Sequence, residues 1–251
     1  MKTRQVAREI LDDLAEDDPD AIRSRRDLGR VHRAMGTRTM LLRALREMTA
    51  SRRDRAPLRV LELGAGDGSL MLGVAQELAP SWPKVELTLL DAQAVVGRDT
   101  LARFAQLGWT AVAEVNDVFD WAAGTNDPRL MNRQPARWDL IVSNLFLHHF
   151  EDEHLAGLFG AIADRGARFF ASEPRRARLA LAGSHLVGLL GSNWVTRQDA
   201  VSSVRAGFRG QELSALWPDV GRRWHVREYA AGLFSHCFRA EPMDTSHANT
   251  V

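Results

Sequence analysis

From Leu58 onward, short apolar runs alternate with amphipathic segments of helical length, and this alternation is what most constrains the fold. The run LRVLEL ends at glycines and is followed by SLMLGVAQELA, which has helical periodicity. Helical segments follow at residues 96–108 and about 151–165. Further strand patterns occupy residues 85–91, 110–117, 138–144 and 167–173. The alternation predicts an α/β fold with a parallel sheet, helices on both faces, and a ligand site beyond the carboxyl ends of the strands.

The two ends of the chain have a different pattern. Residues 1–55 have helical periodicity, for example from Val6 to Leu14, and no strand pattern, so we expect an N-terminal helical cap. Residues 174–209 are also helical in pattern, and TRQDAVSSV offers a threonine N-cap. RWHVREYAA and LFSHCFRAE, separated by a turn at Gly232, predict an antiparallel hairpin. The expected parts are a cap and substrate lid at 1–55, a sheet domain at 56–241 and a flexible tail at 242–251.

The composition is that of an ordinary globular protein. The chain has 251 residues, 45% hydrophobic and 26% charged, with 33 Lys and Arg against 32 Asp and Glu. This balance provides no field that would attract nucleic acid. The single cysteine, Cys237, cannot form an intramolecular disulfide, the charged start does not resemble a signal peptide, and no apolar run is long enough to span a bilayer. We therefore expect a cytoplasmic protein without a membrane span.

The glycine-rich turn Glu62-Leu63-Gly64-Ala65-Gly66-Asp67-Gly68 follows the first predicted sheet strand. Glycines at this place let the backbone turn sharply and approach a ligand closely. Several nucleotide-binding folds use such a turn, so by itself it is weak evidence. The spacing is Gly-x-Gly-x-Gly, and Ser69 stands where the dinucleotide fingerprint requires its third glycine. This argues against a nicotinamide-dependent dehydrogenase, although the strand and helix alternation is the same.

Two acidic residues end the next strands. Asp91 lies about twenty residues after the glycine turn, where a carboxylate can accept hydrogen bonds from both hydroxyls of a ribose. Asp117 and Val118 close the third strand, where a side chain and a backbone N–H can recognise the edge of an adenine. For Asp91 the alternative is an ordinary helix cap or loop acid.

The motifs ELGAGDG, LLD, VND and WDLIVSN, in this order and spacing, resemble those of class I S-adenosylmethionine-dependent methyltransferases over residues 56–175. The resemblance implies a Rossmann-like, mostly parallel seven-stranded sheet with an antiparallel last strand. It also implies S-adenosylmethionine as the cofactor. Asn144 would lie beside the transferable methyl group. The full set of cofactor-binding residues implied is Glu62, Gly64, Ala65, Gly66, Asp91, Ala92, Asp117, Val118 and Asn144.

The segment LFLHHFEDEHLAGLF (145–159) is similar to segments of small-molecule methyltransferases, including those of quinone biosynthesis and plant phenol O-methyltransferases. In the plant enzymes the matching histidine is the general base, which implies that role for His148, with His149 as the other candidate. A histidine titrates near neutrality and suits removal of a hydroxyl proton. Both histidines have the alternative of capping the helix or bonding within the loop. The chain lacks the large N-terminal dimerisation domain of the plant enzymes.

We therefore expect O-methylation of a phenolic, quinol or polyketide-type hydroxyl in secondary metabolism, without a metal, by a monomer or homodimer. The substrate would be an aromatic or apolar small molecule, and no nucleic acid is involved. His32, Met35 and Met40 with residues 179–194 would form an apolar lid, although such residues are more often core. The alternatives are an RNA or protein methyltransferase and a non-catalytic protein that binds S-adenosylmethionine.

Overall fold

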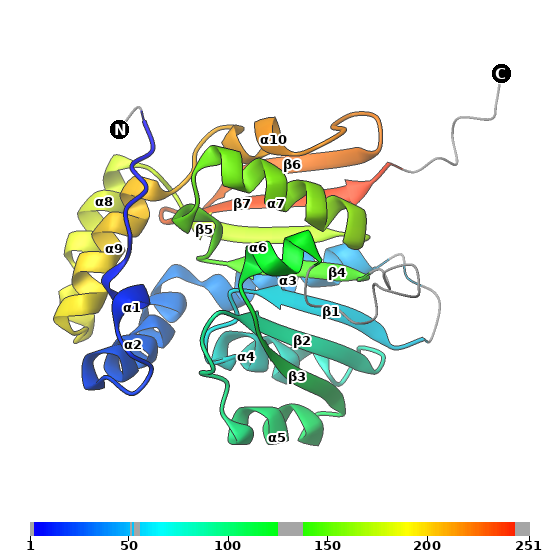
Figure 1. Ribbon diagram of the computed structural model, residues 1–251, viewed down its shortest axis with the longest axis horizontal. Helices are drawn as coiled ribbons and strands as arrows, with labels where there is room; N and C mark the ends of the chain where they lie inside the picture. Colours follow the sequence, from blue (N-terminus) through cyan, green and yellow to red (C-terminus); the bar gives the residue numbers. More distant parts are fainter. Residues whose placement is uncertain (1–2, 51, 53–55, 125–137, 244–251) are drawn as a thin grey trace.

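A computed structural model describes residues 3–50, 52, 56–124 and 138–243. Its strands are β1 (Leu58–Leu63), β2 (Val85–Asp91), β3 (Trp109–Val115), β4 (Leu140–Asn144), β5 (Phe169–Pro174), β6 (Trp224–Ala231) and β7 (Ser235–Pro242). They form one sheet in the order β3-β2-β1-β4-β5-β7-β6 (Figure 1). β7 is antiparallel to both of its neighbours, and the other four pairs are parallel. The predicted mostly parallel sheet with an antiparallel last strand is confirmed.

Helices cover both faces of the sheet and one end of it (Figure 1). The helices are α1 (Ile10–Asp13), α2 (Pro19–Met35), α3 (Thr37–Thr49), α4 (Ser69–Leu78), α5 (Arg98–Gln106), α6 (Val118–Ala123), α7 (Asp152–Arg165), α8 (Arg178–His185), α9 (Trp194–Ala206) and α10 (Glu212–Leu216), with 3-10 turns η1 (Leu147–His149) and η2 (Val187–Leu190). Residues of α3, α4 and α5 build the core on one face, and residues of α6, α7 and α10 build the core on the other.

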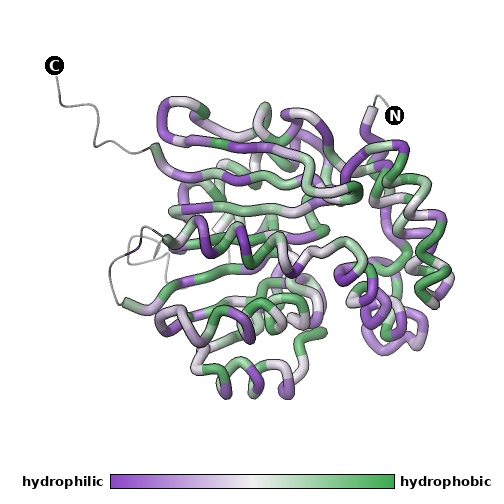
Figure 2. The backbone as a smooth tube through the Cα atoms, turned by 180° about the vertical axis from the view of Figure 1, so that it is seen from behind, coloured by the Kyte–Doolittle hydropathy of each residue, from purple (hydrophilic) through white to green (hydrophobic). Residues whose placement is uncertain are grey.

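β1 shows why this sheet is buried on both sides. Leu58 and Val60 belong to the first core, and Leu61 and Leu63 belong to the second. Successive side chains of a strand point to opposite faces, so a central parallel strand must be apolar almost throughout. Figure 2 shows this hydrophobic character along the central strands and the hydrophilic character of much of α2.

The N-terminal segment departs from its predicted helix. The periodicity from Val6 to Leu14 indicates a helix, but only Ile10–Asp13 is helical. Residues ahead of it run along α9, where Gln5 N donates to the carbonyl of Arg205 at 3.2 Å. The Asp199 carboxylate accepts from Ile10 N at 2.9 Å and Leu11 N at 3.0 Å. Tertiary hydrogen bonds thus satisfy backbone groups that a longer helix would have paired internally.

The helices before β1 separate into two groups. α3 packs under the sheet, where Leu41, Leu45 and Met48 are almost fully buried. α1 and α2 instead contact α9, which also contacts α8 and η2. We call α1, α2, α8, η2 and α9 the cap; these helices lie together at one end of the sheet (Figure 1).

Smaller details of the elements also differ from expectation. The N-cap of α9 is Asn193, whose side-chain oxygen accepts from Thr196 N at 3.0 Å, so the predicted threonine cap is wrong. β7 extends to Pro242, and the predicted tail lies outside the described residues from position 244. Among the described residues, no helix has the length and hydropathy that crossing a bilayer requires.

Candidate functional site

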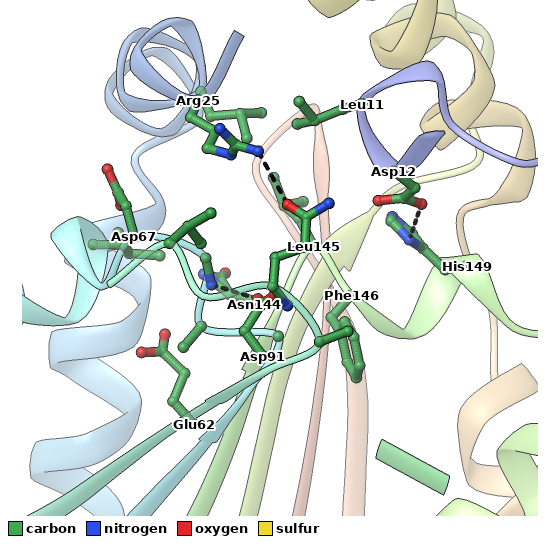
Figure 3. Close-up of a pocket in the computed structure, with 18 of the residues that line it drawn as sticks. Leu11, Asp12, Arg25, Glu62, Asp67, Asp91, Asn144, Leu145, Phe146 and His149 are labelled. Atoms are coloured by element: carbon green, nitrogen blue, oxygen red, sulfur yellow. Dashed lines mark hydrogen bonds and ion pairs between the residues drawn. The ribbon is translucent and has the colours of Figure 1, made fainter. Parts of the chain in front are cut away.

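A cavity of about 430 Å³ lies at the carboxyl ends of β1, β2, β3 and β4, beneath the cap. Figure 3 shows Glu62, Asp91 and Asn144 at its floor, with Arg25 and Leu11 of the cap above them. Every predicted site residue lines this cavity: Glu62, Gly64, Ala65, Gly66, Asp91, Ala92, Asp117, Val118, Asn144, His148 and His149. Residues from four strand ends therefore meet at one place.

The glycine turn has the backbone geometry that requires glycine. Gly64 has φ +68° and Gly66 has φ +55°, a region that residues with a Cβ rarely adopt. A Cβ on Gly64 would also collide with the ring of Phe146. The backbone N–H groups of Gly64 and Ala65 both donate to the carbonyl of Leu90, at 2.9 and 3.0 Å. The turn is thereby held against the end of β2.

Asp91 supports the glycine turn as well as the cavity wall. Its Oδ2 accepts from Gly66 N at 2.8 Å, and its Oδ1 accepts from Gln93 N at 2.9 Å. Burial raises the pKa of Asp91, and these two hydrogen bonds oppose that rise. A carboxylate has about four lone-pair sites, so each oxygen keeps one for a ligand hydroxyl.

Asp117 is the N-cap of α6. Its Oδ1 accepts from Phe119 N at 2.7 Å. The side chain is exposed and the neighbouring Val118 is buried, yet both line the cavity. Capping occupies one carboxylate oxygen and leaves the other directed to solvent or ligand.

Three polar side chains at the cavity have atoms without a hydrogen-bond partner among the described residues. They are Glu62 at Oε2, Asn144 at both amide atoms, and His32 at Nδ1. Burial, followed by the charges of Asp91 and Asp67, raises the pKa of Glu62 to about 8. Leaving a buried polar group unpaired costs about 1–3 kcal/mol. The fold retains three of them around one cavity, which points to a polar ligand.

His148 lies in η1, just beyond β4, and only 2% of its surface is exposed. Its Nδ1 is 2.8 Å from Glu173 Oε2, and its Nε2 is 3.2 Å from Glu9 Oε1. Burial alone would lower the pKa of His148, but hydrogen bonds to the two carboxylates and their charges outweigh it and raise the pKa to about 9. The imidazole is therefore protonated at neutral pH while both carboxylates face it.

Glu173 anchors this histidine from β5. The side chain is fully buried, and its Oε1 accepts from the backbone N–H of Phe146 at 3.2 Å and of Leu147 at 3.0 Å. Its other oxygen remains for His148 Nδ1. A carboxylate that is fixed by backbone donors fixes the orientation of the imidazole in turn.

Glu9, the residue directly before α1, lies beside both histidines. Its Oε1 faces His148, its Oε2 is 3.5 Å from His149 Nε2, and Ser203 Oγ donates to Oε1. Burial would raise the pKa of Glu9, but the hydrogen bond and charge of His148 and the charge of His149 lower it to about 2. Asp12 Oδ2 lies 3.2 Å from His149 Nδ1 (Figure 3). Glu9 is thus an anion beside two imidazoles.

The same three side chains offer a donor set for a metal. Ligand-type atoms of Glu9, His148 and His149 lie within 4.8 Å of one another. Imidazole and carboxylate suit divalent transition metals, and each imidazole has a carboxylate on its other nitrogen, as metal-bound histidines do. Without a metal, the same side chains interact as ion pairs between Glu9 and the two histidines.

Sequence reasoning missed the central place of Glu9. No motif marks this residue, and its partner His148 is 139 positions away. His32, predicted for a substrate lid, lines the same cavity as the glycine turn. Met35 lines a second cavity, whereas Met40 packs against the core under the sheet and is not part of a lid.

A family model described as "Methyltransferase domain" matches residues 32–240. A comparison with curated protein sequences finds no match.

Solved structures match the chain at low sequence identity. The plantazolicin methyltransferase BpumL in complex with SAH is 12% identical with a TM-score of 0.59, over 90% of this chain and 92% of that chain. BamL, in complex with a triazolic desmethylPZN analog and SAH, is 14% identical with a TM-score of 0.58, over 92% of each chain. The CMeT domain of the citrinin polyketide synthase is 17% identical with a TM-score of 0.51, over 76% of this chain and 48% of that chain. At these identities the similarity shows a common fold.

Proposed function

The chain belongs to the methyltransferase domain family, and we propose that it transfers a methyl group from S-adenosylmethionine to a hydroxyl of a small apolar molecule, with His148 as general base. The observation that carries this proposal is that the nine predicted cofactor residues and His148 line one cavity of about 430 Å³. A polyketide-type acceptor is compatible with the name of one structural neighbour, the CMeT domain of the citrinin polyketide synthase.

The residues present fit S-adenosylmethionine, which supplies a methyl group on a positively charged sulfur. The backbone of Gly64, Ala65 and Gly66 gives a close approach without Cβ atoms. The unpartnered atoms of Glu62 and Asn144 would take the polar methionine part. Asp91 and Ala92 would hold the ribose of the cofactor, and Asp117 and Val118 would hold its adenine.

The pairing of His148 with Glu173 supports Nε2 of His148 as the atom that would accept the proton. Because Glu173 occupies Nδ1 from the interior of the protein, Nε2 is the nitrogen that can meet an acceptor. His148 would take the hydroxyl proton on Nε2 while the acceptor oxygen bonds to the methyl carbon. The bond between that carbon and the sulfur would break, and its electron pair would stay on the sulfur of S-adenosylhomocysteine. The same pairing stabilises the imidazolium that results, as a buried carboxylate does in other histidine bases.

Glu9 occupies the position beside Nε2 where the acceptor hydroxyl would bind. As long as Glu9 holds His148 protonated, the histidine cannot accept a proton at neutral pH. Acceptor binding must therefore weaken the contact between Glu9 and His148. Since Glu9 belongs to the segment that precedes α1, a small shift of this segment would lower the pKa of His148.

A methyl-transfer assay tests the proposed function. The protein is incubated with S-adenosylmethionine that carries an isotopic methyl group, together with phenols, quinols, amines and carboxylic acids of matched size. We expect label on the hydroxyl acceptors and formation of S-adenosylhomocysteine. Exclusive labelling of amines or carboxylates would remove the hydroxyl assignment, and absence of S-adenosylhomocysteine binding in calorimetry would remove the cofactor site.

A further inference from the structure

A second cavity, of about 370 Å³, lies inside the cap between α2, α8, η2 and α9. Its wall is mostly apolar and includes Leu28, Val31, Met35, Ala180, Val204 and Phe234. The charged residues that line it are both acidic, Glu9 and Asp199. None of the described residues that line it is basic, so this cavity does not suit an anionic ligand.

The two cavities share a wall next to the candidate base. Five residues line both of them: Glu9, Leu11, Leu28, Leu145 and Ser203. Leu145 directly follows β4 and has φ +51°, a conformation that costs about 1–3 kcal/mol for a residue with a Cβ. Such strain is characteristic of ligand sites, and here it lies between the two cavities, three residues before His148.

The outer rim of the second cavity consists of exposed leucines. Leu186, Leu189 and Leu190 line it, and their exposed fractions are 58%, 82% and 40%. Exposed apolar side chains that are contiguous with an apolar cavity indicate a surface that an apolar ligand covers. Most of the other side chains that line this cavity, between the rim and the shared wall, are also apolar.

We propose that the second cavity binds the apolar tail of the acceptor, so that the substrate is an uncharged amphiphile, a phenol or quinol with an alkyl chain. This inference rests on the proposed function, because the hydroxyl head would meet His148 at the shared wall. The cavity has a volume of about 370 Å³, within the range of sites that hold small organic ligands. An alkyl tail that is longer than the cavity would extend past the leucine rim.

The first test is a series of 4-alkylphenols with tails of two to sixteen carbons. Burial of one methylene is worth a factor of about four in affinity. We expect kcat/KM to rise by up to that factor per carbon and to level off once the tail is long enough to pass the leucine rim. A value independent of tail length would overturn the inference, even if phenols are methylated.

The second test is a pair of matched substitutions on the cap. Ala200 lines the second cavity from α9, and Ala182 on α8 is exposed and does not line it. Ala200→Trp fills the cavity, so KM for 4-dodecylphenol should rise at least tenfold while the affinity for S-adenosylhomocysteine and the turnover of unsubstituted phenol stay unchanged. Ala182→Trp should leave all three unchanged. If both variants fold and have the same KM for 4-dodecylphenol, the inference is contradicted.

A binding measurement separates this inference from the proposed function. The complex with S-adenosylhomocysteine is titrated with 4-dodecylphenol in a calorimeter. Binding that Ala200→Trp abolishes, without methyl transfer to any hydroxyl, would keep the tail site and remove the O-methylation. Methylation of short phenols without binding of 4-dodecylphenol would keep the O-methylation and remove the tail site.

Discussion

Glu9 Oε1 and His148 Nε2 are 3.2 Å apart, although the two residues are separated by 139 positions in the chain. Glu9 directly precedes α1 of the cap, and His148 lies in the turn after β4, so this contact joins the N-terminal segment to the candidate base. The charge of Glu9 helps to raise the pKa of His148 to about 9. The protonation of the base therefore depends on where the cap lies.

Removing that charge should shift the pH profile. In Glu9→Gln the pKa of His148 falls, because one of its two carboxylate partners is lost. A base acts when unprotonated, so kcat/KM rises as the pH increases through this pKa, and the rise should move to lower pH. A decrease of about one pKa unit would raise kcat/KM about tenfold at neutral pH. Asp12→Asn removes the carboxylate beside His149 Nδ1 and leaves both carboxylate partners of His148 in place, so it is the control and should not move the rise.

Loss of the imidazole should separate chemistry from cofactor binding. We expect His148→Ala to lower kcat by about a hundredfold or more, since general bases contribute about 10²–10⁴. Calorimetry should find nearly the same affinity for S-adenosylhomocysteine. His149→Ala is the comparison, with a smaller loss. If His148→Ala keeps full turnover, proximity and orientation suffice and the base assignment must be abandoned.

Asp91→Ala should weaken the cofactor site in two ways. It removes the acceptor for the proposed ribose contact and also the acceptor for Gly66 N, which holds the glycine turn. The loss should amount to about 1.5–3 kcal/mol of binding free energy for S-adenosylhomocysteine. Asp91→Asn keeps one carbonyl acceptor and should lose less. An unchanged dissociation constant in Asp91→Ala would rule out the ribose contact.

Cofactor binding should release a proton from Glu62. Its pKa of about 8 means that the carboxyl is largely protonated at pH 7 in the free protein. A cationic group of the cofactor beside it would favour the carboxylate and lower that pKa. Calorimetric titrations at pH 7 in buffers of different ionisation enthalpy should therefore show proton release, which Glu62→Gln abolishes. Identical heats in all buffers for the native protein would contradict this role.

Chelation distinguishes the base from a metal site at Glu9, His148 and His149. If His148 is the base, turnover after exhaustive treatment with a chelator should equal that of the untreated enzyme. A metal ligand role predicts the opposite: one equivalent of transition metal by elemental analysis, loss of turnover on chelation, and a similar loss in His148→Ala and His149→Ala.

Short stretches of the sequence are sufficient to predict the sheet and the residues at its cofactor-binding edge. The strand periodicity of β1, the left-handed glycines at 64 and 66, and the acids at the ends of β2 and β3 each depend on a few consecutive residues. Parallel strands place their carboxyl ends at one edge, so residues such as Asp91 and Asn144 converge once the strands are known. Short-range rules are sufficient for this part.

Other features depend on contacts that no local pattern encodes. The segment from Val6 to Leu14 has helical periodicity, yet only Ile10–Asp13 is helical. Residues from far along the chain bond to this part of the backbone: Arg205 O accepts from Gln5 N, and Asp199 accepts from Ile10 N. The carboxylates of Glu173 and Glu9 raise the pKa of His148. The sequence does not show that these carboxylates lie beside the histidine, so it predicts a pKa near neutrality. Burial and electrostatic interaction depend on distances in space, and the distance between Glu9 and His148 exists only when the cap is folded against the sheet.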